Sequence, residues 1–563
     1  MGRKIELPIG IEDFKVLIDN NYYYADKTKL LCDLTRSIGK VNLFTRPRRF
    51  GKALNLSMIQ RFFEKTEEDN AYLFDGLYVA NAGEDYMAYQ GQYPVVTISL
   101  KGMKTNSFDG AIKQFGWMLS MEFQRHSEIL ESELVTDAEK AYFKKIAGWN
   151  ASVADYTVAI QFLTSTLYRI HHQKTIVLID EYDVPLETAH FCGFYQEMID
   201  FIRSLFSNAL KTNASLSMAV LTGCLRVSKE SLFTGLNNLR INSILTPDFS
   251  DYFGFTEQEV NDMVTYYGLE TNLSTIKEWY DGYQFGTSEI YNPWSVLNYL
   301  QDAKANSAAF PLPYWSNTSS NTIVHQLITE SDEDTRDLVE ELVNGGSITA
   351  QIHEDIVYAD IDVNQNRIWS FLLFTGYLKT VSMQMANDEL QVEMVIPNRE
   401  VRSIYRRDIR QWFEETTRKS SRADLLNALL LPDEMQVTHI VETWLNETIS
   451  YYDEQEQFYH GFMAGLISGF KGFKLRSNRE SGEGRPDLML MERNQKTTAI
   501  VLEIKAANPK KKNETLESKL AEAFKQIEDN HYEEELRNEG YQNILLYGVS
   551  FREKTCLVRL KKS

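Results

Sequence analysis

The sequence predicts an α/β protein built from two modules, and three observations carry this prediction. A short apolar strand, Val41–Phe44, is followed by a glycine-containing loop and a helical pattern at Leu54–Phe63. A second apolar strand, Thr175–Ile179, ends in two carboxylates. Further on, two short strands, Pro486–Met491 and Ala499–Ile504, are each associated with an acidic residue. Strand-loop-helix units build parallel sheets, and strands joined by a short polar turn build hairpins.

Length and composition limit the class of protein. The 563 residues are too many for one hydrophobic core, and the 43% apolar and 25% charged residues are ordinary for a globular chain. We see no apolar run long enough to span a membrane and no signal-peptide core, so we expect a cytoplasmic protein. Four scattered cysteines without metal-ligand spacing predict reduced thiols: Cys32, Cys192, Cys224 and Cys556.

We expect three domains, with the parallel-sheet module in residues 1–250, a helical lid and connecting domain in 251–432, and the second α/β module in 433–563. Pro432 marks the second boundary, because the residue before a proline disfavours helix. The turn Trp279–Gly286 is rich in aromatic residues, which we expect in the core. Helical patterns in the middle region cover Glu257–Thr265, Leu273–Tyr280, Asn321–Asn344, Ile368–Tyr377 and Glu400–Thr416.

The loop after the first strand has the features of a phosphate-binding (Walker A) loop. Its sequence is Arg-Pro-Arg-Arg-Phe-Gly-Lys-Ala, residues 46–53, between a strand and a helix. In such a loop the backbone N–H groups cradle the β-phosphate, and the lysine reaches the β- and γ-phosphates. The candidate nucleotide-binding residues are Arg48, Arg49, Gly51, Lys52 and Ala53.

Two positions of this loop depart from the general Walker A pattern. Arg46 occupies the first glycine position, and Ala53 replaces the Ser or Thr whose hydroxyl binds Mg²⁺. The second strand supplies the other half of the site, because Asp180 and Glu181 fit a Walker B element. We expect Asp180 to hold Mg²⁺ and Glu181 to activate the hydrolytic water. The alternative is that this acidic pair caps a helix.

A third strand, Leu216–Leu221, is expected to end near the same edge of the sheet. Arg226 follows it and is our candidate sensor of the γ-phosphate, since a guanidinium complements phosphate charge. Pairing of Arg226 with an acidic surface residue is an equal alternative.

The two C-terminal strands carry Asp487, Glu503 and Lys505. Residues two apart on a strand share a face, so Glu503 and Lys505 point the same way while Ile504 faces the core. Two carboxylates suit a hard cation such as Mg²⁺, or Mn²⁺ in its place, and the ammonium suits a phosphate transition state. We therefore expect phosphodiester hydrolysis. The alternative is a solvated ion pair on an edge strand.

Flanking elements add to this prediction. Tyr451–Phe470 is expected to form a helix with Glu456 and His460 four residues apart on one face, Glu456 being a candidate third metal ligand. Leu516–Tyr532 is expected to form a helix bearing Gln526, a further candidate catalytic residue, and Asn543–Val549 a strand.

Charge is distributed unevenly along the chain. The net charge is −20, yet residues 471–563 carry 19 Lys and Arg against 15 Asp and Glu, leaving −24 on the first 470 residues. Phosphate backbones need such a local basic patch. A solvated surface is an equal interpretation of Lys510–Lys512. The basic residues of this region include Lys474, Arg476, Arg479, Arg485, Lys505, Lys510, Lys511 and Lys512.

Pro486-Asp487 followed by Glu503-Ile504-Lys505 resembles the PD-(D/E)xK nuclease superfamily. The N-terminal part resembles the AAA-ATPase-like P-loop family that is fused to such a nuclease domain in many bacterial proteins. In that family's loop the arginine at position 46 is in pattern and only Ala53 is out of it, through decay or an introduced change. The matching segments are Leu7–Phe14, Tyr23–Thr28, Thr45–Leu56, Leu178–Leu186, Leu221–Asn238, Phe253–Glu259, Trp279–Phe285, Tyr291–Leu300 and Tyr459–Lys505.

The resemblance implies a P-loop NTPase module with a helical lid joined to a Mg²⁺-dependent nuclease that cuts nucleic acid, most often DNA, under control of bound ATP. It is compatible with a homo-oligomer. Because a nuclease fused to an NTPase switch suits cutting that must be controlled to protect the host, we expect a role in defence against phage or other foreign DNA. One rival is a nucleotide-sensing scaffold whose nuclease-like domain is inactive. Another is an ATP-driven motor, which Ala53 disfavours because vigorous hydrolysis needs the missing hydroxyl.

Overall fold

The computed structural model describes residues 5–38, 40–211, 213–226, 238–317, 333–354, 367–386, 388–407, 422–448, 456–468, 470, 472–477, 486–493, 497–509, 511, 513–530 and 532–561. The chain divides into two compact units, one formed by residues 1–327 with 341–405 and the other by 328–340 with 406–563. The three-domain division predicted above is finer and stays a prediction. Among the described residues no helix has both the length and the apolar character needed to cross a bilayer.

The first unit is organised around a five-stranded parallel sheet of order β2-β3-β4-β1-β5. This confirms the predicted parallel sheet. The strand residues are almost all buried, as the apolar runs predict for strands covered on both faces. The strands are β1 (Val41–Thr45), β2 (Val95–Ser99), β3 (Thr175–Asp180), β4 (Leu216–Gly223) and β5 (Leu239–Asn242).

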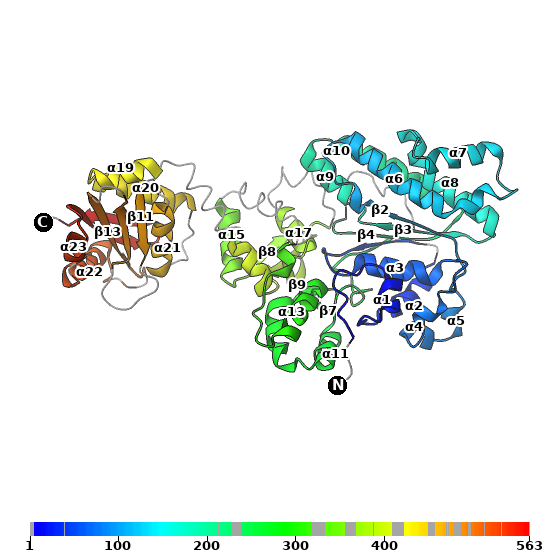
Figure 1. The fold of residues 1–563 in the computed structure, drawn as a ribbon, viewed down its shortest axis with the longest axis horizontal. Coiled ribbons are helices and arrows are strands. Elements are labelled where there is room, and N and C mark those ends of the chain that lie inside the picture. The colour runs from blue at the N-terminus through cyan, green and yellow to red at the C-terminus, as the bar shows by residue number, and fades with distance from the viewer. Residues whose placement is uncertain are drawn as a thin grey trace. The chain divides into compact units, whose positions relative to one another are not determined.

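Helices cover both faces of this sheet (Figure 1). One face carries α1 (Phe14–Asp19), α2 (Lys29–Thr35), α3 (Lys52–Phe63), α4 (Tyr78–Asn81) and α5 (Glu84–Met87). The other carries α6 (Phe108–Arg125), α7 (Asp137–Ala147), α8 (Val153–His171), α9 (Val184–Cys192) and α10 (Tyr195–Leu210). The carboxyl ends of β1, β3 and β4 therefore meet at one edge, where open α/β sheets bind ligands.

A helical region follows the sheet within the same unit. Its first helix begins at a capping box formed by Thr256 and Glu259 and ends at Gly268, whose φ of 69° is left-handed. Leu7 of the N-terminal segment packs into the core of this region. The elements are α11 (Glu257–Tyr267), α12 (Leu273–Tyr280), β6 (Tyr283–Phe285), β7 (Ser288–Ile290) and α13 (Pro293–Ala305).

The remaining part of the unit is a small antiparallel sheet of order β8-β10-β9 with one helix. Its elements are β8 (Ile348–Gln351), α17 (Arg367–Phe374), β9 (Lys379–Ala386) and β10 (Glu389–Val395); α15 (Glu333–Val343) precedes them in the chain. Of the predicted helices Asn321–Asn344 and Glu400–Thr416, residues 321–332 and 408–416 lie outside the described residues.

A buried carboxyl group ties this part to the loop between β1 and α3. Glu400 is fully buried and accepts hydrogen bonds from the Ser295 hydroxyl, at 2.8 and 2.9 Å, and from the N–H of Trp315 at 2.8 Å. The Trp315 indole in turn donates to the carbonyl of Arg48, 3.2 Å away. Burial raises the pKa of Glu400 to about 8. The hydrogen bonds from Trp315 and Ser295 oppose this rise only in part.

The second unit contains a five-stranded mixed sheet of order β11-β12-β13-β14-β15. The predicted hairpin is confirmed, because β12 and β13 pair antiparallel with Met489 opposite Val501. β13 and β14 pair in parallel. The strands are β11 (Phe473–Ser477), β12 (Leu488–Glu492), β13 (Thr498–Ala506), β14 (Asn543–Arg552) and β15 (Thr555–Leu560).

Each face of this sheet has its own apolar core. One core joins Leu490, Leu502 and Ile504 to α19 (Arg422–Leu430), α20 (Glu434–Thr448) and α21 (Glu456–Ile467). The other joins Met489 and Val501 to α22 (Leu516–Asp529) and α23 (Tyr532–Asn538). Alternate residues of β12 and β13 therefore face opposite cores, as a strand period of two requires.

Side chains of α20 cover the outer edge of β15. The carboxylates of Glu434 and Glu442 accept the N–H groups of Leu560 and Cys556 at 2.9 and 3.0 Å. The hydroxyl of Thr438, between them on the helix, accepts the N–H of Val558 at 3.3 Å. The three acceptors are four residues apart along one helix face, and the three donors are two apart along the strand.

Candidate functional site

The loop between β1 and α3 forms a concavity lined by backbone N–H groups. Arg49 and Gly51 have positive φ values of 69° and 81°, and Gly51 is the N-cap of α3. Glycine adopts this conformation without strain. The first N–H groups of a helix have no acceptor within it, so those at the start of α3 remain available to an anion. This is the geometry of a phosphate-binding nest.

Arg46 explains how the loop tolerates an arginine at its first position. Its fully buried guanidinium donates to the carbonyls of Asn242 and Phe249 at 2.7 and 3.1 Å, and it lies over the rings of Phe253 and Phe285. Burial lowers the pKa of Arg46 to about 9. The Arg46 side chain therefore anchors the loop to residues 242–249, and Arg46 does not line the pocket described below.

The other basic residues of the loop are held in different ways. The ammonium of Lys52 donates to the carbonyls of Arg46 and Pro47, 3.0 and 2.8 Å away, so the side chain lies against its own loop. Arg48 pairs with Glu187 at 2.5 Å. Arg49 is exposed and stacks over the ring of Trp294 at 4.5 Å.

At the end of β3, Asp180 is buried and Glu181 is half-buried. The hydroxyl of Thr222, near the end of β4, donates to Asp180 Oδ1 at 2.5 Å and accepts the N–H of Glu181 at 3.4 Å. Burial raises the pKa of Asp180. Asp180 is therefore held by the neighbouring strand, and the helix-capping alternative does not describe it. Sequence reasoning missed Thr222, although a polar residue at a buried strand end was a signal.

Arg226 pairs with an acidic residue, which is the alternative to a sensor role given in the sequence analysis. Its guanidinium lies 3.8 Å from the carboxylate of Glu354, and Arg226 is not one of the residues that line the pocket above the loop. The segment before it is fixed by Asp183, whose carboxylate accepts the N–H groups of Cys224 and Leu225 at 2.7 and 3.0 Å. The role of Arg226 as a sensor stays a prediction.

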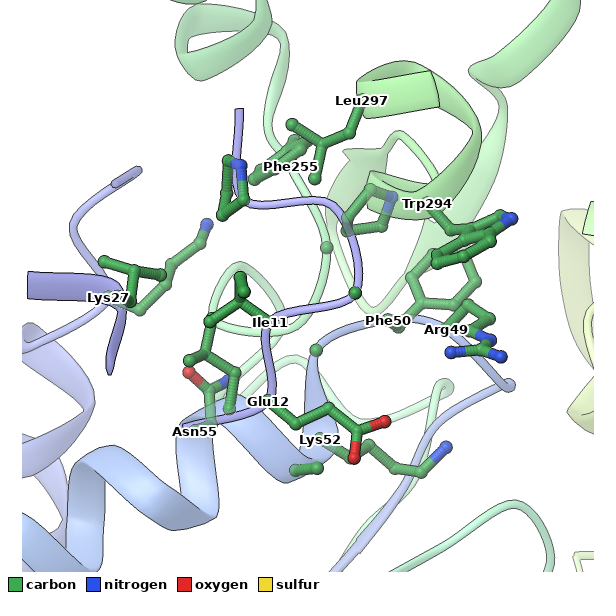
Figure 2. A pocket seen from close by; sticks show the side chains of 18 of the residues that line it. Ile11, Glu12, Lys27, Arg49, Phe50, Lys52, Asn55, Phe255, Trp294 and Leu297 are labelled. Atoms are coloured by element: carbon green, nitrogen blue, oxygen red, sulfur yellow. The ribbon is translucent and has the colours of Figure 1, made fainter. Parts of the chain in front are cut away.

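A pocket of ≈250 Å³ opens above the phosphate-binding loop. Figure 2 shows Glu12 and Lys52 at one end and Phe255, Trp294 and Leu297 at the other. The loop residues Arg48 to Asn55 and Glu181 also line it. One end is thus polar and cationic, and the other is apolar.

Sequence reasoning did not assign the apolar end of the pocket. Its walls come from the N-terminal segment, through Pro8 and Ile11, and from α13, through Trp294 and Leu297. Pro8, Ile11, Trp294 and Leu297 carry no charge, so these residues gave no sequence signal of a ligand. The aromatic turn is core, as predicted, because Tyr283 and Phe285 are buried against the ring of Phe50.

In the second unit, Asp487, directly before β12, comes together with Glu503 and Lys505 of β13. Asp487 Oδ2 accepts the N–H of Ile504 at 2.8 Å, and the Lys505 ammonium lies 3.1 Å from Glu503 Oε1. Ile504 is buried in the core of the opposite face, as predicted. Glu503 is fully buried on the third of five strands, which excludes the alternative of a solvated edge pair.

The buried carboxyl group of Glu503 is incompletely satisfied. Its Oε2 atom has no hydrogen-bond partner among the described residues, although it is shielded from solvent. Burial raises the pKa of Glu503 to about 7, and the neighbouring Asp487 carboxylate adds to this rise. A buried oxygen without a partner costs free energy unless a cation or a proton occupies the site. This oxygen fits a metal ligand.

Comparison with known proteins agrees with the two predicted modules. A family model described as "Predicted AAA-ATPase" matches residues 8–233, and a model of the PD-(D/E)XK nuclease superfamily matches residues 454–560. The chain joins an AAA-ATPase-like domain to a PD-(D/E)XK nuclease domain. A protein of Azotobacter chroococcum mcd 1, described as an uncharacterized protein in the vnfD 5' region, is 26% identical over 98% of this chain and 97% of its own length.

Neighbouring side chains in the nuclease domain come close to the carboxylates. The hydroxyl of Tyr532 accepts a hydrogen bond from Asn530 Nδ2 at 2.8 Å, and its pKa is raised chiefly by burial and further by the Glu503 and Asp487 charges. Gln526 lies on α22. His460 of α21 has its Nε2 atom 3.0 Å from the carbonyl oxygen of Asp487. Glu456 begins α21, but its side chain lies outside the described residues.

Part of the basic patch predicted for the nuclease domain is described. Lys474 and Arg476 are exposed on β11, and Arg476 pairs with Glu539 at 3.1 Å. Lys511 is exposed and pairs with Glu514 at 2.9 Å, which agrees with the solvated-surface interpretation for this residue. Arg479, Arg485, Lys510 and Lys512 lie outside the described residues.

Proposed function

We propose that this protein is a metal-dependent nuclease that cleaves phosphodiester bonds, preferably in DNA, under the control of ATP bound to its AAA-ATPase-like domain. The observation that carries the proposal is the fully buried Glu503, with one oxygen lacking a partner beside Asp487 and Lys505. The setting we propose is the cytoplasm of a bacterium, in defence against phage or other foreign DNA, where cutting must wait for a signal.

The nuclease residues fit a divalent cation such as Mg²⁺ or Mn²⁺. Asp487 and Glu503 would hold it, with Glu456 as a third candidate ligand, since carboxylate oxygens are the ligands that hard cations prefer. When bound, such a cation polarises the phosphate and lowers the pKa of a bound water.

The protein's own groups contribute positioning and charge. The Lys505 ammonium, fixed 3.1 Å from Glu503, would stabilise negative charge that develops on the phosphate oxygens. Gln526, on the helix that covers this face of the sheet, would orient the attacking water. A basic surface that includes Lys474 on β11 would bind the nucleic acid backbone.

In the AAA-ATPase-like domain, the nest at Arg49–Gly51 would hold the phosphates, and the apolar end beside Trp294 and Leu297 would take the base. Asp180 would hold Mg²⁺ and Glu181 would activate water. Because Ala53 supplies no hydroxyl ligand, we propose that ATP binds firmly and is hydrolysed slowly. This favours a switch over a motor.

Cleavage of plasmid DNA and of a structured RNA, assayed with Mg²⁺, Mn²⁺ or Ca²⁺ and with or without ATP, tests the proposal. ATP hydrolysis is measured on the same preparation. Asp487→Asn should abolish cutting and leave the fold intact, because removing one of two neighbouring negative charges rarely destabilises a protein. Asp529→Asn, the same change at an exposed position of α22, is the matched control and should cut normally.

The outcomes separate the candidate functions. Cleavage by the wild-type chain that survives Asp487→Asn would refute the active-site assignment. No cleavage by the wild-type chain with any metal would support a nucleotide-sensing scaffold. Rapid hydrolysis of ATP coupled to movement along nucleic acid would support a motor.

A further inference from the structure

The cations that line the pocket of the AAA-ATPase-like domain differ in how firmly they are held. Lys27 and Arg48 pair with Glu259 and Glu187, whose side chains are only 22% and 14% exposed. Partners of this kind hold a cation firmly, because separation would leave a mostly buried charge unpaired. The cations of the pocket are Lys27, Arg48, Arg49, Lys52, Lys101 and Lys104.

Lys101 is held in another way. Its ammonium donates to both carboxylate oxygens of Glu12, at 2.7 and 3.0 Å, and both side chains are about half exposed, 48% and 49%. Exposed ion pairs contribute little to stability, since water screens them and replaces either partner. Among the described residues of the pocket, this is the carboxylate pair that an anionic ligand can open at least cost.

Lys101 follows β2, the strand that neighbours the Walker B strand β3. Ser99, the last residue of β2, pairs in register with Asp180 of β3, and Lys101 follows in the short helical turn Leu100–Gly102. Lys101, Glu12, Glu181 and Lys52 all line the same pocket. Figure 2 shows Glu12 and Lys52 at the same end of the pocket. A phosphate chain that begins at the nest and runs towards β3 would meet Lys101 with its terminal phosphate.

We propose that Lys101 and Glu12 make the pocket selective for a nucleoside triphosphate over a diphosphate, the γ-phosphate displacing the Glu12 carboxylate from Lys101. This inference rests on the proposed binding of nucleotide to the same pocket. A terminal phosphate carries more negative charge and more acceptor oxygens than one carboxylate, so it competes well for an ammonium. Glu12 is half exposed and turns into solvent when displaced. A diphosphate ends short of Lys101 and leaves the pair intact.

Calorimetry with the full chain, using ATP and ADP separately in the presence of Mg²⁺, tests this inference. Lys101→Ala should weaken ATP binding about 10-fold, or about 1.4 kcal/mol, which is the size of one hydrogen bond to a charged group. It should leave ADP binding within about 2-fold. Glu12→Gln removes the competing charge and should strengthen ATP binding about 3-fold with ADP unchanged.

Lys15→Ala is the matched control. Lys15 pairs with Glu68 at 2.8 Å, close to the distance in the Lys101–Glu12 pair, and does not line the pocket. Its loss should change neither affinity. A merely structural role of Lys101 would lower the affinities for ATP and ADP alike and would leave their ratio unchanged.

The result separates this inference from the proposed function. Suppose that the wild-type chain binds ATP but Lys101→Ala leaves the ATP-to-ADP affinity ratio unchanged. The inference that Lys101 and Glu12 select a triphosphate is then wrong, while the proposal that the pocket binds nucleotide is retained. If the wild-type chain binds neither nucleotide, both proposals about this pocket fail.

Discussion

The two candidate sites of this chain are built from the same kinds of group in different ways. In the nuclease domain, Asp487 directly precedes β12, Glu503 lies on the adjacent strand β13, and Lys505 contacts Glu503 directly, 3.1 Å away. In the AAA-ATPase-like domain, Asp180 is instead held by the hydroxyl of Thr222, and Lys52 is held by backbone carbonyls. Both domains thus combine a buried acid with a lysine, but only the nuclease site pairs the two.

This difference indicates what each site lacks without ligands. Glu503 has a buried oxygen without a partner, so the nuclease site gains most from a cation. In the candidate nucleotide pocket, Lys52 and Lys101 already have protein partners, the backbone carbonyls of the loop and Glu12, and binding must replace those contacts. A site with an unsatisfied oxygen is suited to holding a metal, and a site with exchangeable contacts is suited to switching.

The largest expected effect is at the nuclease site. Glu503→Gln should lower DNA cleavage at least ~100-fold, because the neutral amide is a poor ligand for a divalent cation. The fold should survive, since a buried amide is no harder to accommodate than a buried charge. Cleavage rates and thermal unfolding measured on the same variant check this. Glu528→Gln, an exposed change on α22, is the control.

The second effect concerns the nucleotide pocket. Lys52→Ala should weaken ATP binding about 10- to 100-fold, the loss expected when hydrogen bonds from an ammonium to phosphate are removed. Nucleotide-independent DNA cleavage should be unchanged. Calorimetry and the plasmid assay together measure both quantities, with the exposed Lys65→Ala as control. ATP affinity equal to that of the wild-type chain would remove Lys52 from the site.

A smaller effect, in the direction of a gain, is expected at position 53. Ala53→Thr would supply the absent hydroxyl at the second residue of α3, where a side chain is half-buried and the helix N-terminus is open. ATP hydrolysis should rise about 10-fold, by analogy with the loss caused by removing a supporting group of a metal site. If the variant binds ATP and hydrolyses it no faster, the limiting group lies elsewhere, for example in a partner subunit.

The smallest effect concerns Glu400, a buried acid outside both candidate sites that can be compared with Asp180 and Glu503. The quantity affected is the stability of the fold as a function of pH. The pKa of Glu400 is raised from 4.5 to about 8, so the folded state binds more protons than the unfolded state between these values. Stability should therefore fall as pH rises through this window, by up to about 1.4 kcal/mol per pH unit. Glu400→Gln should flatten this dependence.

Thermal unfolding between pH 5.5 and 8.5 checks the Glu400 prediction. The variant should melt about 2 °C or more above the wild-type chain at the alkaline end. The tyrosines Tyr280, Tyr283 and Tyr314 lie near the same carboxyl group, but burial raises their pKa values, so they stay neutral in this range. Equal slopes for both proteins would contradict the assignment.

Short-range patterns predicted most of the fold. The strand-loop-helix at residues 41–63, the strand before Asp180 and the hairpin carrying Glu503 are confirmed, because each is specified by apolar period and flanking turn residues within a few positions. The juxtaposition of Glu503 and Lys505 followed from strand geometry alone.

Contacts between distant segments were not predictable in this way. The Arg46 anchor depends on carbonyls about 200 residues away, and the apolar end of the pocket combines residues 8–11 with residues 255–297. Thr222 meets Asp180 only because β4 lies beside β3. No local pattern encodes such pairings, since they depend on strand order and on which helices cover the sheet.

The cover that α20 provides for β15 bears on how this strand is kept from pairing with other extended chains. An open strand edge offers its N–H groups to any other extended chain, and this is a common start of aggregation. Here Glu434, Thr438 and Glu442 occupy the outward N–H groups of the last strand. Release of α20 would expose this edge and also open the apolar core to which α20 contributes, so β15 is expected to become a site of self-association once α20 detaches.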